Sequence, residues 1–184
     1  MLYWVRTQGK DGFSMKKLLV LLCALTLAAV SAAHAQADFT ALCGGQPIFT
    51  LQYDEKAFSL DTESYLGSSV GGHTWLGMLF DGSATVEFSA DVYADLPADC
   101  DTSRLADYLS GLLAGEQCAF LEQYTSPGQV PFVIFSLNGA AGQSYYAALL
   151  VQGYAVHFEI YNLRGGVGPE ALATLKSLLD GVRL

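Results

Sequence analysis

Hydrophobic and polar residues alternate with a period of two along several segments of this chain. In residues 85–93 the even-numbered positions are apolar and the odd-numbered positions are polar. Residues 154–161 show the same pattern, with His157 and Glu159 on the polar side. Strict alternation is typical of a β-strand with one face in a core and the other in solvent. Both segments are therefore predicted strands, with His157 and Glu159 exposed about 7 Å apart along one of them.

Two other segments carry apolar residues at helical spacing. In the first, they recur within residues 105–113, and Asp101 or Thr102 can cap the start of the helix. The second follows Pro169, whose missing N–H costs nothing in a first turn, and ends near Gly181. The pattern thus predicts two amphipathic helices.

The remaining periodic segments complete a predicted order of four strands, a helix, four strands and a second helix. Short turn-forming sequences separate the strands, which favours antiparallel neighbours. We therefore expect an α+β fold, with a single antiparallel β-sheet and both helices packed on one face. The other strand candidates are residues 48–53, 57–61, 74–80, 118–124, 131–137 and 144–152.

The N-terminal region has the layout of a secretory signal peptide over residues 15–35. Lys16 and Lys17 precede an apolar run at 18–30, and Ala33-His34-Ala35 forms a small-x-small cleavage site. The run has about 13 residues, whereas a membrane-spanning helix needs about 20. We expect a secreted or periplasmic protein with no permanent membrane span after cleavage.

The signal peptide divides the chain into three parts. Residues 1–14 fit no part of a signal peptide and are expected to be a misassigned start or a disordered extension. Residues 36–184 are predicted to form a single α+β domain, since 149 residues suffice for one core.

This domain is strongly acidic. It has five lysine and arginine residues against seventeen aspartate and glutamate residues, a net charge of −12. Such a charge repels phosphate backbones, which excludes nucleic acid as a partner. The expected partner is a protein or a small molecule, and the sequence does not specify which.

Three cysteines follow the predicted cleavage site: Cys43, Cys100 and Cys118. An exported chain meets oxidising conditions, so one disulfide and one odd thiol are expected. The predicted helix between Cys100 and Cys118 holds its ends about 18 Å apart, whereas bridged Cα atoms lie within about 7 Å. Cys43 with Cys100 and Cys43 with Cys118 stay open, as do three reduced thiols.

The order of predicted elements over nearly all of residues 36–184 resembles the PsbP/DcrB-like superfamily of secreted and lumenal domains. Residues 49–53 with 58–60 look like the opening strand pair of the family, and the hairpin 144–161 with the helix end at 178–182 looks like its final unit. Asp54 stands where members often have proline. The resemblance implies an α+β fold and a non-enzymatic accessory or binding role, and it transfers no functional residue.

One segment matches a catalytic motif. Residues 67–71 read G-x-S-x-G, the pattern of a hydrolase nucleophile elbow, with Ser69 as nucleophile and His73 or His157 as its base. The motif needs a strand-to-helix turn, whereas glycines and a strand follow here. A small serine hydrolase is therefore kept as an alternative function.

An acidic segment precedes the first helix and contains Asp91, Asp95, Asp99 and Asp101. Carboxylate oxygens are the ligands that Ca²⁺ prefers, so a calcium-stabilised exported protein is a second alternative. The spacing lacks the glycine and terminal glutamate of a helix–loop–helix calcium site. Asp99 and Asp101 also favour the positive end of the helix dipole.

The polar sheet face is the remaining candidate surface. Tyr93 and Tyr161 fall on the same side of their strands as His157 and Glu159. A sheet face that exposes tyrosines can dock a protein or small ligand. We therefore expect an exported, non-catalytic binding module that uses these four residues and requires no cofactor.

Overall fold

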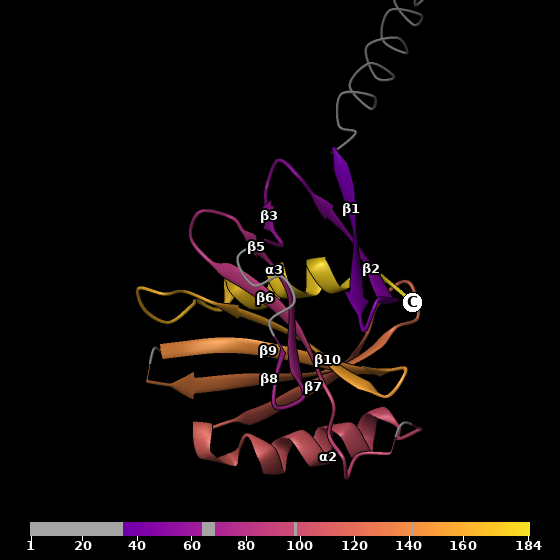
Figure 1. The fold of residues 1–184 in the computed structure, drawn as a ribbon. Helices are drawn as coiled ribbons and strands as arrows, with labels where there is room; N and C mark the ends of the chain where they lie inside the picture. The colour runs from indigo at the N-terminus through magenta and orange to yellow at the C-terminus, as the bar shows by residue number, and fades with distance from the viewer. Residues whose placement is uncertain (1–34, 64–68, 98, 141) are drawn as a thin grey trace, which may run out of the picture. The chain divides into compact units, whose positions relative to one another are not determined.

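The computed structural model describes residues 35–63, 69–97, 99–140 and 142–184 (Figure 1). Residues 36–184 form one compact unit. The predicted signal peptide, except Ala35, and the preceding extension lie outside the described residues. The first strand begins at Gln36, directly after the predicted cleavage site.

Most of the unit belongs to a large antiparallel sheet with the strand order β3-β5-β6-β10-β9-β8-β7, and the short β4 also pairs with β5. Every pairing joins neighbours that run in opposite directions, and short turns connect most consecutive strands. The strands are β3 (Ser59–Asp61), β4 (Ser69–Val70), β5 (His73–Phe80), β6 (Thr85–Asp91), β7 (Ala119–Thr125), β8 (Pro131–Gly139), β9 (Gly142–Val151) and β10 (Tyr154–Tyr161).

A second, smaller sheet has the order β1 (Gln36–Cys43), β2 (Gln46–Asp54) and β11 (Val182–Arg183). The expectation of a single sheet is therefore wrong. The β1–β2 hairpin carries Phe39 and Phe49, whose rings pack against Phe88 of the large sheet at centroid distances of 5.4 and 6.3 Å. Burial of these rings stabilises the fold more than pairing the hairpin with the edge of the large sheet would. The hairpin therefore packs as a second layer on that sheet.

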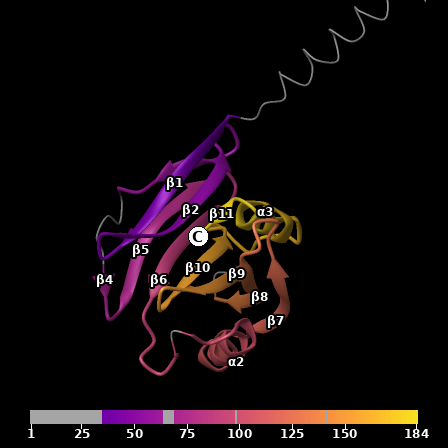
Figure 2. The same ribbon diagram turned by 90° about the vertical axis from the view of Figure 1, so that its right-hand side faces the viewer.

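The two helices, α2 (Thr102–Leu112) and α3 (Glu170–Leu179), lie on opposite faces of the large sheet (Figures 1 and 2). The expectation that both pack on one face is also wrong. The cause is that β8 is apolar on both sides, with residues 132–135 all buried. Phe132 and Ile134 face the core with α3, whereas Val133 and Phe135 face the core with α2.

The predicted helices and eight predicted strands are confirmed, with small shifts in their ends. The side chain of Asp101 caps α2 by accepting a hydrogen bond of 2.8 Å from the backbone N–H of Arg104. A three-residue 3₁₀ helix, η1 (Ala114–Glu116), follows α2. The predicted order is wrong at three places, since β1, β4 and β11 were not expected.

Candidate functional site

The side chains with the densest polar contacts lie on the sheet face that carries α2. Helix α2 packs on β7, β8 and β9, and beside it the same face of β5, β6 and β10 bears polar residues. The strand registers set these residues opposite one another, with His73 facing Asp91, Ser89 facing His157, and Glu87 facing Glu159. Alternation along each strand is what puts all of them on one face.

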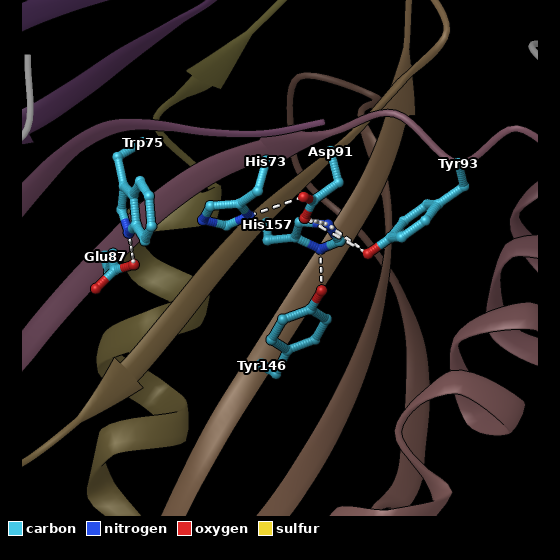
Figure 3. A network of polar contacts seen from close by, with 7 residues as sticks. All are labelled: His73, Trp75, Glu87, Asp91, Tyr93, Tyr146 and His157. Atoms are coloured by element: carbon cyan, nitrogen blue, oxygen red, sulfur yellow. Dashed lines mark hydrogen bonds and ion pairs between the residues drawn. The ribbon is translucent and has the colours of Figure 1, made fainter. Parts of the chain in front are cut away.

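Asp91 is the centre of this network (Figure 3). Its Oδ1 lies 2.7 Å from Nδ1 of His73, and its Oδ2 lies 2.8 Å from Nε2 of His157. The hydroxyl of Tyr93 donates to the same Oδ2 at 3.4 Å. One half-buried carboxylate therefore holds two imidazole rings from two different strands.

His157 is 3% exposed, and both of its ring nitrogens have partners. Burial lowers the pKa of His157, and the neighbouring Asp91 carboxylate only partly offsets this effect. The ring is therefore neutral at pH 7. The network assigns the tautomer: Nε2–H donates to Asp91, and Nδ1 accepts the hydroxyl proton of Tyr146.

The surroundings of Asp91, Tyr93 and Tyr146 shift the pKa of each of these groups. Desolvation by itself would raise the pKa of Asp91, but hydrogen bonds and charges from His157 and His73 outweigh it and hold that pKa below its usual value. Burial, and then the charge of Asp91, raise the pKa of Tyr93, and burial raises that of Tyr146. At neutral pH Asp91 is thus an anion, and the phenols of Tyr93 and Tyr146 beside it are neutral.

A second carboxylate, that of Glu87, is linked to Asp91 through the rings of Trp75 and His73. The rings of His73 and Trp75 meet edge to face with centroids 4.3 Å apart. The indole N–H of Trp75 donates to Oε1 of Glu87 at 2.7 Å, and the hydroxyl of Tyr161 donates to Oε2 at 3.1 Å. Both oxygens of Glu87 are therefore held in place.

Glu159 is the third carboxylate on this face, and Ser144 donates to its Oε1 at 2.7 Å. Glu159 and Glu87 are direct partners across β10 and β6. Like charges at directly opposed positions, with Cβ atoms about 5 Å apart, destabilise a sheet. A local rule broken in this way often marks a functional site.

Two hollows in the protein surface meet at this carboxylate pair. The smaller, about 120 Å³, lies over the network and is lined by Asp91, both histidines, Tyr146 and the two glutamates. The larger, about 750 Å³, shares Glu87 and Glu159 and extends past Tyr161 to the turn between β8 and β9. We call the two together the polar groove, and its size suits a small molecule.

The four residues expected on the binding face do share one face, although one prediction about them is wrong. Tyr93, His157, Glu159 and Tyr161 all belong to the polar groove or its network. His157 was expected to be exposed, but it is buried because Tyr146 and Tyr93 close over it.

Sequence reasoning missed His73, Trp75, Glu87 and Tyr146 as members of the site. The odd-numbered polar positions of residues 85–93 already place Glu87 on the same face as Asp91 and Tyr93. His73 and Trp75 also alternate, but an irregularity between Trp75 and Gly77 shifts the register of β5 and masks the pattern.

The four aspartates of the predicted calcium site have different environments. Asp91 belongs to the network, Asp101 caps α2, and Asp95 and Asp99 are exposed between them. Among the residues that the structure describes, no group of three or more His, Cys, Asp or Glu side chains could hold a metal ion. The calcium site stays a prediction.

Ser69, the expected nucleophile of the alternative hydrolase, belongs to β4 and pairs with Thr74 of β5. Gly67 and Ser68 of the motif lie outside the described residues. The backbone at Ser69 is thus a strand that leads through a turn into another strand, whereas the hydrolase motif needs a turn into a helix. The hydrolase function stays a prediction.

Neither Cys43 nor Cys100 forms a disulfide in this structure. Cys43 is buried in the core that contains α3, whereas Cys100 and Cys118 pack against the core that contains α2. Either expected pairing with Cys43 would have to join opposite faces of the large sheet. Disulfide pairing stays a prediction.

Within the described residues, no helix has the length and apolar character needed to cross a membrane. No protein-family model matches this chain, and no curated protein is significantly similar to it. The resemblance to the PsbP/DcrB-like superfamily accordingly stays a prediction. Function has to be argued from the polar groove.

Proposed function

We propose that residues 36–184 are an exported, non-catalytic module that binds a small, positively charged ligand in the polar groove. The single observation that carries this proposal is the directly opposed pair Glu87 and Glu159 where the two hollows meet. A ligand ammonium group between the two carboxylates would relieve their repulsion. Charge-assisted hydrogen bonds of this kind contribute about 1.5–3 kcal/mol each.

The charge of the surroundings favours a cation over an anion. The described residues that line the polar groove include no lysine or arginine. Beyond the groove, the net charge of −12 attracts cations at long range. Tyr161 and Asn162 also line the larger hollow and supply polar groups that can orient a ligand.

The absence of catalysis is proposed from the state of the histidines. Both ring nitrogens of His157 are engaged, and its burial keeps it from exchanging protons with a ligand. His73 is 31% exposed, but its Nδ1 is held by Asp91 and its ring rests against Trp75. The two rings therefore serve to position Asp91 and the groove wall.

Export is supported by the agreement between two boundaries. The predicted signal peptide ends at Ala35, and the compact unit begins with β1 at Gln36. Cleavage at this point would release the unit without removing a residue of any described strand.

The test uses three four-carbon compounds that carry two positive charges, no charge and two negative charges: 1,4-diaminobutane, 1,4-butanediol and succinate. Each is added at constant ionic strength while thermal unfolding of the protein is followed. A ligand present at ten times its Kd stabilises by about 1.4 kcal/mol, which raises the Tm of a domain of this size by about 3–6 °C. We expect this rise with the diamine alone.

Matched variants localise the effect. Glu159→Gln should abolish the rise in Tm with the diamine, because an amide oxygen can still accept from Ser144 but carries no charge. Glu55→Gln is the control, since Glu55 is an exposed carboxylate outside the polar groove. Equal shifts with the diamine and the diol, or an unchanged diamine shift in Glu159→Gln, would contradict the proposal.

A further inference from the structure

A second large hollow, of about 790 Å³, lies between β1 and β5, and Val92, which follows β6, and Tyr154 of β10 also line it. We call it the apolar groove, because side chains of aromatic and aliphatic residues dominate its wall. The aromatic and aliphatic residues that line it include Phe39, Leu42, Leu76, Val92 and Tyr154. Its volume falls in the range of about 300–1,000 Å³ typical of small-molecule sites.

Two of these side chains are exposed to an unusual degree for their type. Leu42 of β1 is 55% exposed and Val92, directly after β6, is 54% exposed, and both line the same groove. Leaving such residues in solvent forgoes their burial energy, which is about 25 cal/mol per Å² of apolar surface. Apolar surface gathered in a concave site, in contrast to scattered surface residues, points to a ligand.

Charge decides which ligand suits the apolar groove. None of the described residues that line it is aspartate, glutamate, lysine, arginine or histidine, although the domain carries a net charge of −12. An anionic ligand would meet no cation there and would be repelled by the domain, and a cationic ligand would find its carboxylates in the polar groove instead. Only an uncharged ligand matches the wall.

We propose that the apolar groove binds an uncharged, hydrophobic small molecule. Thr74 and Tyr154 also line the groove, and a few polar residues of this kind orient a ligand in such sites. This site is separate from the proposed cation site and does not depend on it. Trp75 contributes to both: it lines the apolar groove, and its indole N–H donates to Glu87 on the side of the polar groove.

The shared tryptophan provides the assay. The chain has two tryptophans, so in a full-length Trp4→Phe background Trp75 is the only indole. The neutral probe 1-N-phenylnaphthylamine becomes fluorescent in apolar sites and accepts excitation energy from nearby tryptophan. We expect saturable probe fluorescence when Trp75 is excited, with one probe bound per chain.

Charged variants of the rim test the location of the probe. Leu42→Glu and Val92→Glu should each weaken probe binding at least tenfold, because both place a charge in an uncharged wall. Both residues are already exposed, so the variants should fold normally. Leu163→Glu is the matched control: Leu163 is 81% exposed and lies outside the groove, so probe affinity should not change.

Three results would overturn the proposal. The first is the absence of probe binding, and the second is equal affinity in Leu42→Glu and Leu163→Glu. The third is a dimer in light scattering that Leu42→Glu dissociates, because the groove would then be covered by a second copy of the chain. Glu159→Gln should leave probe binding intact, so this test and the diamine test can fail independently.

Discussion

Replacing His157 by phenylalanine tests whether the buried network is organised as we describe. Phenylalanine fills similar space but cannot bond to Asp91 or Tyr146. The Tyr146 hydroxyl then loses the acceptor that His157 provides, and Asp91 keeps His73 and Tyr93. A buried polar group without a partner costs about 1–3 kcal/mol, so His157→Phe should lower the free energy of unfolding by about 2–4 kcal/mol at pH 7.5.

The cost of His157→Phe should shrink in acid. The folded-state pKa of His157 lies below its ordinary value because burial disfavours the imidazolium ion. As the pH falls below about 6.5, the unfolded chain gains a proton on His157 that the folded chain does not take up. The wild type therefore loses up to about 1.4 kcal/mol per pH unit from this group, and His157→Phe does not.

A double-mutant cycle isolates the His157–Tyr146 bond. Tyr146→Phe alone removes the donor to Nδ1 and should cost about 1–3 kcal/mol. In the His157→Phe background the Tyr146 hydroxyl has already lost this bond, so removing the hydroxyl costs less. The double variant should therefore cost about 1–2 kcal/mol less than the sum of the single variants. Tyr145→Phe is the control, because Tyr145 faces the opposite core and should combine additively with His157→Phe.

Urea unfolding at pH 7.5, 6.5 and 5.5 supplies each free energy, provided that the slope with denaturant is the same for all variants. Our description of the network would be refuted if His157→Phe lost stability in parallel with the wild type as the pH fell. Additive costs of His157→Phe and Tyr146→Phe would refute the hydrogen bond between these two side chains.

Three further predictions concern positions outside the polar groove. Tyr124 donates to Asp180, and this bond raises the pKa of Tyr124 to about 12. The stability that the bond contributes below pH 10 should therefore be lost as the pH rises toward 12. In urea titrations Tyr124→Phe should cost about 1 kcal/mol at pH 7 and should not show this alkaline loss. A Cβ at Gly181 would lie 2.0 Å from the carbonyl oxygen of Gln52, so Gly181→Ala should lower the unfolding free energy by more than about 2 kcal/mol in urea. A Cβ at Gly111 in α2 meets nothing within 4 Å, so Gly111→Ala should raise the Tm by stabilising the helix by about 0.5–1 kcal/mol.

The sequence by itself determined the local elements and the faces of several strands. The period-two pattern placed Tyr93, His157, Glu159 and Tyr161 on one face, and the structure keeps them there. The sequence also limited the cap of α2 to Asp101 or Thr102, and the structure shows Asp101 in this role. These features depend on residues close together in the chain, whose preferences act before any tertiary contact forms.

Only the tertiary structure decided how the elements meet. The β1–β2 hairpin forms a separate sheet because Phe39 and Phe49 pack against Phe88 of the large sheet. The helices lie on opposite faces because β8 is apolar on both sides. The site depends on the same long-range packing: Tyr93 and His157 are 64 residues apart in the chain, and strand order and register alone bring them together. Alternation along one strand shows which residues share a face. Which residues become neighbours across strands depends on strand order and register, and packing of the whole chain fixes both.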